Sequence, residues 1–442
     1  MNATINIRRW FTKERLLANS PALLIVLCFG LFVRKAAFNW PLAIMAITGI
    51  YLLIKHYKTI TSSIQFRWFL VLFSCLWIPT LVALPDAEVI RSASSAGRYI
   101  LYPLMAAFIL FFFAKNNKLQ KVVFYGACVV CIFFCVDGLV QYVFGRNLIG
   151  FPYDGQRLNG MSFPKYRLGT VLSVMSPLLF ELVRIHAPRY KILWLALPLL
   201  VVIILLTATR SSWFMFAVAV FVYALYMMRL YPWNKLLRIF SVALTLIAVI
   251  GYAAYNTKQV KQRVDSALLM FKGDYENIDK ATSYRLSLWA TAWTMGTQNY
   301  INGVGVRAYR FEKVYSKYAG EKDFYLNRHK ANIAAHKSKS PDAPSPEFRA
   351  QPHPHQIFLE IFAETGLVGL VGYLLFWILS FKFIRTVKPE YASDVIPWFL
   401  VLIAAINPVN FHMAFYGHYW SSFIMLILMI GVAASTGKLK SD

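Results

Sequence analysis

The sequence predicts an all-α polytopic membrane protein with about twelve transmembrane helices and one large helical loop on the outer side. Of the 442 residues, 58% are hydrophobic and only 15% are charged, against about 25% charged residues in soluble domains. The apolar residues gather into runs near the length that crosses a bilayer, and the polar ones concentrate in residues 256–356. A soluble fold of this length needs more polar surface, so soluble proteins are excluded, and no nucleic-acid partner is expected despite the net charge of +26.

Twelve apolar runs define the predicted spans. They lie near 20–33, 36–54, 68–84, 98–114, 122–144, 168–184, 192–209, 211–228, 239–255, 357–381, 396–410 and 418–434. Basic residues precede the first run, as in a signal peptide, but no small-residue cleavage site follows it. We therefore interpret it as a retained first span.

The distribution of Lys and Arg predicts the orientation. With a cytoplasmic N-terminus, the inner segments carry 21 basic residues and the short outer loops carry 9. The remaining 16 lie in the long outer segment, and long segments translocate largely regardless of charge. Both termini are therefore expected in the cytoplasm.

Three regions follow from this topology. Residues 1–255 hold transmembrane helices 1–9 with short loops, residues 256–356 form the outer loop domain, and residues 357–442 hold helices 10–12 and the C-terminus. The loop domain contains four of the eight histidines and 9 of the acidic residues.

Within the loop, apolar periodicity predicts two helices, at 258–272 and 283–297, the second beginning at an N-cap of Thr282 or Ser283. Its tryptophans suit a helix at the membrane surface. The proline-rich segment 337–354 lacks an apolar stripe, and it is either a mobile gate over a site or a passive linker.

Two arginines suit an anionic ligand at the membrane edge. Arg210 lies in the tight turn between two apolar runs, where it either snorkels into the headgroups or binds phosphate oxygens with its planar fork. Arg285 lies in the first turn of the helix predicted at 283–297, where the helix dipole and backbone N–H groups favour phosphate. The alternative for Arg285 is an ordinary exposed arginine.

The segment Pro352-His353-Pro354-His355-Gln356 precedes the tenth span. Pro354 disfavours helix at His353, so the helix should begin around His355. A histidine in the first helical turn stays neutral near pH 7 and can accept a proton as a general base, although a lone histidine is more often structural.

Farther along, Glu364 precedes Gly366, Gly369 and Gly372, a small-residue face that allows close helix packing. Glu364 lies nine residues beyond His355, about 13 Å along a helix, so we interpret it as part of a structural ion pair. An Asp-x-Asp pair, a histidine–carboxylate metal-ligand spacing and a phosphate-binding glycine loop are missing from the sequence, so no metal and no cofactor are expected.

Together these segments resemble the O-antigen ligase and polymerase superfamily of bacterial envelopes. The resemblance rests on RLNGMSFPKYRLGTVLS, ATRSSWFMF, SYRLSLWATAWTMGTQNYINGVGVRAY and HPHQIFLEIFAETGLVG, and it covers about residues 157–434. The histidine motif with its E-x-G-x-x-G continuation is the most specific element.

The resemblance implies an all-helical, GT-C-like glycosyltransferase of the bacterial inner membrane with a periplasmic active site. Such an enzyme takes a glycan from an undecaprenyl-pyrophosphate carrier without metal or nucleotide. By resemblance, His355 matches the catalytic histidine, and Arg210 and Arg285 match the pyrophosphate-binding arginines. Arg157, His353, Gln356 and Glu364 are candidates for supporting roles.

Two departures from the family pattern concern the amide and the last outer loop. Gln356 stands where many members have Asn. The last outer loop, NPVNFHMAFYGHYW, lacks the acid that some ligases carry there, so a role for Asn410, His412 or His418 stays open.

Two acceptors fit these motifs. A ligase transfers the glycan to lipid A–core oligosaccharide, and a polymerase transfers it to another carrier-linked glycan. Basic residues of the outer loop favour the phosphorylated lipid A–core, unless they form a solvated face; they are Lys313, Lys317, Lys322, Arg328, Lys330, Lys337 and Lys339. A flippase or transporter of lipid-linked glycan, which also needs arginines but no base, is the third hypothesis.

Overall fold

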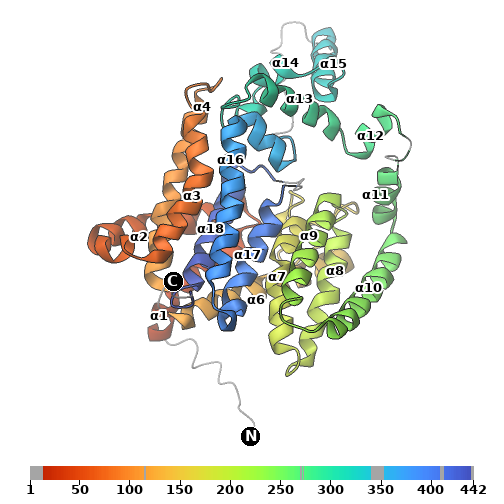
Figure 1. Cartoon of the computed structure of the whole chain (residues 1–442). Coiled ribbons are helices and arrows are strands. Elements are labelled where there is room, and N and C mark those ends of the chain that lie inside the picture. The colour runs from red at the N-terminus through yellow and green to blue at the C-terminus, as the bar shows by residue number, and fades with distance from the viewer. Residues whose placement is uncertain are drawn as a thin grey trace.

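The computed structural model describes residues 13–113, 116–268, 271, 273–339, 353–408 and 413–439. Helices dominate these residues, which contain two isolated β-bridges and no strand. Figure 1 shows a bundle of long helices with a group of shorter helices, α12 to α15, at one end. The predicted fold class, an all-α multi-pass membrane protein, is confirmed.

Each of the twelve predicted runs coincides with an apolar helix. Within the described residues, nine stretches are long and apolar enough to cross a membrane. They are α2 (Lys35–Thr61), α3 (Ile64–Val82), α4 (Arg91–Gly97) continued by η2 (Arg98–Ile100) and α5 (Leu101–Phe113), α6 (Asn117–Phe144), α7 (Leu168–His186), α9 (Arg210–Met227), α10 (Trp233–Tyr255), α16 (Ile357–Thr386), and η7 (Pro389–Tyr391) with α17 (Ala392–Ile406). Shorter apolar helices fill the other three runs: α1 (Lys13–Leu31), η4 (Lys191–Leu195) with α8 (Ala196–Leu206), and α18 (His418–Ala434).

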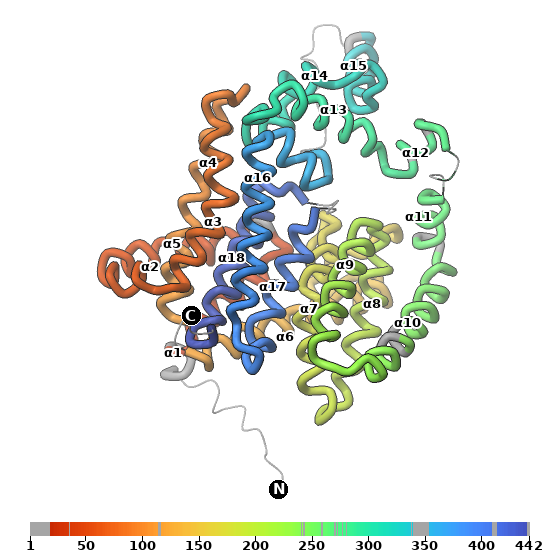
Figure 2. Tube along the Cα trace, in the orientation of Figure 1, coloured from red at the N-terminus to blue at the C-terminus, as the bar shows by residue number. Residues whose placement is uncertain are grey.

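The core surrounds α18, which is buried along nearly its whole length. A helix that is apolar on every side is expected at the centre of a bundle. It packs against α3, α5 and α17, whereas α10 lies at the periphery with most of its surface exposed (Figure 2). The short helix α18 therefore anchors the residues at its N-terminal end in the middle of the molecule.

The described ends of the chain lie away from the short helices. The hydroxyl of Tyr419, at the start of α18, donates to Phe32 O just past the end of α1 (2.6 Å). At the other end of the bundle, Lys388 N donates to Lys438 O (2.8 Å). The beginning of α1 and the segment after α18 are therefore both at the end of the bundle opposite α12–α15 (Figure 1).

The long segment after α10 is helical, as predicted. It contains α11 (Lys258–Leu268), α12 (Tyr275–Ala281), α13 (Arg285–Gln298), η6 (Ala308–Arg310), α14 (Glu312–Tyr318) and α15 (Phe324–Lys339). The first and third match the two predicted helices, and the others carry too weak an apolar stripe to be identified from sequence. Most of the proline-rich segment, 340–352, lies outside the described residues.

The predicted N-cap of α13 is wrong. Tyr284 is the N-cap, in the left-handed conformation and without a side-chain cap bond. The carboxylate of Asp279 takes that role instead: it accepts from Leu286 N (2.9 Å) and from the hydroxyl of Ser287 (3.0 Å). An acid from the preceding helix replaces the expected local cap because two left-handed residues, Ser283 and Tyr284, fold the chain back on α12.

A break in α16 attaches the loop region to the bundle. Gly366 adopts φ +60° inside the helix, which frees backbone groups on both sides of it. Residues 300–305, the Gly-Val-Gly turn and the residues before it, pair with those groups. The hydrogen bonds run from Val304 N to Ala363 O (2.9 Å), Gly305 N to Glu364 O (3.1 Å), Leu367 N to Tyr300 O (2.7 Å) and Val368 N to Ile301 O (3.2 Å).

The glycines of α16 therefore have two different functions. A Cβ on Gly372 would lie 2.2 Å from Cys75 O of α3, so this glycine permits the close helix packing that its spacing predicted. A Cβ on Gly366 would lie 2.2 Å from Ile301 O. Gly366 is required for the break and for the pairing with residues 300–305, which the spacing did not predict.

The substitution Gly366→Ala tests the break. Strain at positive φ and the clash with Ile301 O are expected to lower the free energy of unfolding by more than about 2 kcal/mol. Thermal unfolding in detergent measures the effect. Gly30→Ala in α1, where nothing lies within 4 Å of the added Cβ, is the control; equal melting temperatures for the two variants would contradict the role given to Gly366.

Candidate active site

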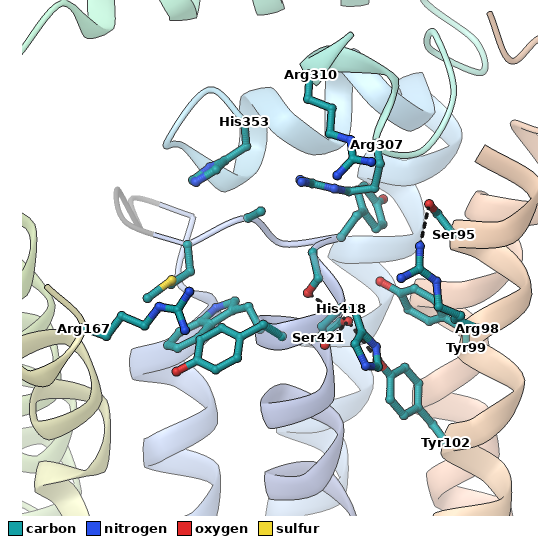
Figure 3. A pocket seen from close by; sticks show the side chains of 16 residues that line it. Ser95, Arg98, Tyr99, Tyr102, Arg167, Arg307, Arg310, His353, His418 and Ser421 are labelled. Atoms are coloured by element: carbon teal, nitrogen blue, oxygen red, sulfur yellow. Dashed lines mark hydrogen bonds between the residues drawn. The ribbon is translucent and has the colours of Figure 1, made fainter. Parts of the chain in front are cut away.

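A cavity of about 300 Å³ lies where the α4–α5 junction, the start of α7, the turn before η6 and the start of α18 meet (Figure 3). Its walls combine arginines, histidines and aromatic rings. They are Ser95, Arg98, Tyr99, Tyr102, Arg167, Arg307, Arg310, His353, Met413, Ala414, Tyr416, Gly417, His418, Tyr419, Trp420 and Ser421.

Four of these residues are arginines, and none of the sixteen is acidic. We call Arg98, Arg167, Arg307 and Arg310 the cavity cluster. Arg98 donates to Ser95 Oγ (3.3 Å), and the guanidinium of Arg167 lies 4.4 Å from the ring centre of Tyr419. Burial lowers the pKa of Arg310, and the positive charges of neighbouring arginines lower it further. The cavity is therefore a concentration of positive charge without a matching carboxylate in its wall.

Arg307 is held from behind by two buried acids of α16. Its backbone N–H donates to Glu364 Oε2 (2.6 Å), and its Nη1 lies 3.7 Å from Glu360 Oε1. Nη1 is buried and has no hydrogen-bond partner among the described residues. Glu364 thus holds the backbone of Arg307 and Glu360 faces one end of its guanidinium, while the side chain lines the cavity (Figure 3).

Glu360 joins three segments of the site. Its carboxylate accepts from Phe415 N (2.9 Å) and Tyr416 N (3.1 Å), in the loop that leads into α18. It also lies 3.7 Å from Nδ1 of His353. One carboxylate therefore holds the loop before α18, faces the cavity arginine Arg307 and lies close to the segment before α16.

A second group of arginines lies at the start of α9 and α13. Arg210 is the first residue of α9, and it bridges to the turn between α12 and α13. Its Nη1 donates to Ala281 O (2.5 Å) and its Nη2 to Ser283 Oγ (2.7 Å). Arg210 thus ties a membrane helix to the loop region.

Arg157, Arg263 and Arg285 complete this group, which we call the α9–α13 cluster together with Arg210. Burial lowers the pKa of Arg285 to about 10, and the charge of Arg210 lowers it further. Burial also lowers the pKa of Arg263, with the charges of Arg157 and Arg210 acting in the same direction. Like charges this close favour an anionic ligand among them.

The structure corrects the predicted position of His355. Gln356 is the N-cap of α16, and its Oε1 accepts from Leu359 N (2.5 Å). His355 therefore precedes the helix, with φ +56°, instead of lying in its first turn. The amide side chain of Gln356 competes for the cap position more effectively than an imidazole, which is why the helix begins later than predicted.

His353 and His355 form a pair. Their ring centres are 4.1 Å apart, and the backbone N–H of His355 donates to Nδ1 of His353 (3.1 Å). That nitrogen of His353 is therefore an acceptor, which places the ring proton of the neutral form on Nε2.

The histidine pair connects the two clusters. His353 lines the cavity. On the other side, Trp289 of α13 donates from Nε1 to Pro354 O (3.0 Å), and Trp289 shares a helical face with Arg285, four residues earlier. One helix, α13, therefore presents an arginine of the α9–α13 cluster and holds the peptide between the two histidines.

Backbone strain is concentrated at these residues. Five non-glycine residues of the described chain have φ between +47° and +63°. Arg307 and His355 are among them, and the other three, Ala208, Ser283 and Tyr284, lie within two residues of Arg210 or Arg285. Such conformations cost about 1–3 kcal/mol each and tend to cluster at functional sites, so the strain marks the same two clusters and the histidine pair as the site.

The sequence identified part of this arrangement. Arg157, Arg210 and Arg285 lie together, and His353 lies against His355. Glu364 contacts Arg307. Sequence reasoning missed Arg98, Arg167, Arg263, Arg307, Arg310 and Glu360. For Glu360, the four-residue spacing to Glu364 on one apolar helix was an available signal.

Of the residues left open in the last outer loop, His418 lines the cavity, and its Nε2 lies 3.2 Å from Asn39 Oδ1. Asn410 and His412 lie outside the described residues. Over the part of the chain that the structure describes, no group of three or more His, Cys, Asp or Glu side chains is placed to hold a metal ion.

The fold and the site define a multi-pass membrane protein with a basic, histidine-containing site at the end of its bundle. Residues 195–374 match the family model described as O-antigen ligase. This match confirms the resemblance to the O-antigen ligase and polymerase superfamily. It supports O-antigen ligase or polymerase activity in general, and hence a membrane glycosyltransferase that uses a lipid-linked glycan. No curated protein gives a significant match to the chain.

Glu360→Gln tests the carboxylate that joins the site. Each carboxylate oxygen accepts one backbone N–H, and an amide has only one such oxygen; the change also removes the charge that lies 3.7 Å from Nη1 of Arg307. We expect the free energy of unfolding to fall by about 2–4 kcal/mol, measured by thermal unfolding in detergent. The exposed Glu390→Gln is the control; similar melting temperatures for the two variants would show that Glu360 does not organise the site.

Proposed function

We propose that this protein is an O-antigen ligase of the bacterial inner membrane. It transfers a glycan from undecaprenyl pyrophosphate to lipid A–core oligosaccharide at the periplasmic face. The observation that carries the proposal is the histidine pair between two arginine clusters, with His355 next to the peptide that Trp289 of α13 holds. A base between two anion-binding groups suits a transfer between two phosphorylated lipids.

The α9–α13 cluster is the proposed site of the donor diphosphate. Arg210 begins a membrane helix and Arg285 begins the helix above it, so both lie where a lipid-anchored diphosphate leaves the bilayer. Guanidinium groups neutralise the charge that develops on a departing diphosphate. Arg157 and Arg263 add to the same positive field.

His355 is the proposed general base. It accepts the proton of the acceptor hydroxyl, whose oxygen attacks the anomeric carbon. The bond from that carbon to the diphosphate breaks, and undecaprenyl diphosphate leaves with the bonding electrons. A single displacement inverts the anomeric centre. His353, Gln356 and Glu364 support this step, since His353 accepts the backbone N–H of His355 and Gln356 caps the helix that follows.

The arrangement of regions suits this topology. Residues 1–255 and 357–442 form the membrane part, and residues 256–356 form the periplasmic part with the active site beneath it. Both ends of the chain are then cytoplasmic. Positive charge on the periplasmic helices α14 and α15 favours the phosphorylated lipid A–core as acceptor, although Lys317 already pairs with Glu88 (3.0 Å).

Transfer by the purified protein in lipid tests the activity. The assay supplies undecaprenyl-pyrophosphate-linked O-antigen and lipid A–core in EDTA, and gel electrophoresis resolves the products. We expect glycan on lipid A–core. Longer carrier-linked glycan with bare lipid A–core would instead identify a polymerase.

His355→Ala tests the base. We expect the transfer rate to fall at least about 100-fold, the usual contribution of general-base catalysis, with an unchanged melting temperature. His186→Ala is the control, because His186 is the last residue of α7, at the opposite end of that helix from the cavity residue Arg167, and contacts Tyr125. A flippase would be indicated if His355→Ala exported glycan at the wild-type level while Arg210→Ala exported none. That result would contradict a catalytic role for His355.

A further inference from the structure

The cavity cluster is separate from the donor site just proposed. The proposed donor site uses Arg157, Arg210, Arg263 and Arg285, and none of these lines the cavity. The cavity draws its arginines from different elements: the α4–α5 junction, the start of α7 and the turn at η6. The molecule therefore contains two groups of arginines. The donor diphosphate would bind the α9–α13 cluster, which leaves the cavity cluster without an assigned ligand.

The chemistry of the cavity indicates what it binds. Four guanidinium groups face about 300 Å³ of space whose lining contains no carboxylate. A phosphate or carboxylate would accept hydrogen bonds from these guanidinium groups and offset the mutual repulsion of the arginines. The volume is at the lower end of the range for ligand sites, which suits a single sugar unit.

The aromatic part of the wall favours a sugar over a free anion. Tyr99, Tyr102 and Trp420 line the cavity beside the arginines, and so does Tyr419, whose ring already contacts Arg167 and Phe32. Flat aromatic faces pack against the apolar face of a sugar ring, while their polar tips and nearby hydroxyl groups bind its hydroxyls. The hydroxyls of Tyr102 and Ser421 also belong to the wall, where they hydrogen-bond to each other (2.9 Å).

We propose that the cavity binds a phosphate- or carboxylate-bearing sugar of the acceptor glycan. This inference rests on the proposed glycosyl transfer, which defines one substrate as the donor and the other as the acceptor. With the donor diphosphate at the α9–α13 cluster and the anionic acceptor sugar in the cavity, the two substrates approach the histidine pair from opposite sides. His353 belongs to the cavity wall, and His355 lies against it.

Arg98→Gln and Arg310→Gln test this site, because both side chains are exposed and neither holds distant segments together. We expect each to raise the KM for phosphorylated lipid A–core about tenfold, the loss of one charge-assisted contact, and to leave the KM for the donor within twofold. Chemically dephosphorylated lipid A–core should show a raised KM with the wild type and no further rise with the variants. Arg91→Gln, from α4 but outside the cavity lining, is the matched control and should change neither KM.

A binding measurement separates this inference from the proposed function. Glucose 1-phosphate, but not glucose, should raise the melting temperature of the wild type, and Arg98→Gln and Arg310→Gln should abolish the rise. If glucose 1-phosphate stabilises the protein in this way but the transfer assay gives no product on any acceptor, the ligase proposal is overturned and the anionic-sugar site is retained. A raised donor KM in these variants would overturn the acceptor assignment, and an equal effect of both sugars would overturn the site itself.

Discussion

Two buried carboxylates on α16 hold the site together. Glu360 and Glu364 are fully buried, and burying an acid is costly unless charges and hydrogen-bond donors surround it. Their partners come from distant parts of the chain: Arg307 from the turn before η6, and the amides of Phe415 and Tyr416 from the loop before α18. Satisfying these acids therefore fixes the turn before η6 and the loop before α18 against α16. The break at Gly366 contributes, since it frees the backbone groups of α16 that pair with residues 300–305.

The features that could be predicted from sequence are those determined by local composition. The bilayer requires long apolar runs, so the twelve apolar helices among the described residues were located from sequence, and Arg210 was identified because it lies between two such runs. The cavity cluster could not be predicted, because Arg98, Arg167, Arg307 and Arg310 meet only after the bundle and the loop have packed. The start of α16 was misplaced by two residues, because Gln356 caps the helix where His355 was expected to enter it. The helix break at Gly366 could not be predicted, because the spacing of Gly366, Gly369 and Gly372 is the same as that of glycines in ordinary helix packing.

Strain and charge coincide in this molecule. The left-handed residues lie next to the arginines and the histidine of the site, and the arginines lie next to one another with few compensating acids. Both features cost stability. Anionic substrates, bound as proposed, would offset the repulsion among the eight arginines of the two clusters.

Initial-rate kinetics with both substrates varied test the central claim, that donor and acceptor occupy separate basic sites on either side of the histidine pair at the same time. The donor concentration is varied at several fixed concentrations of lipid A–core. We expect double-reciprocal lines that intersect, because both substrates bind before transfer. Parallel lines, which indicate that the donor reacts and its carrier leaves before the acceptor binds, would contradict it.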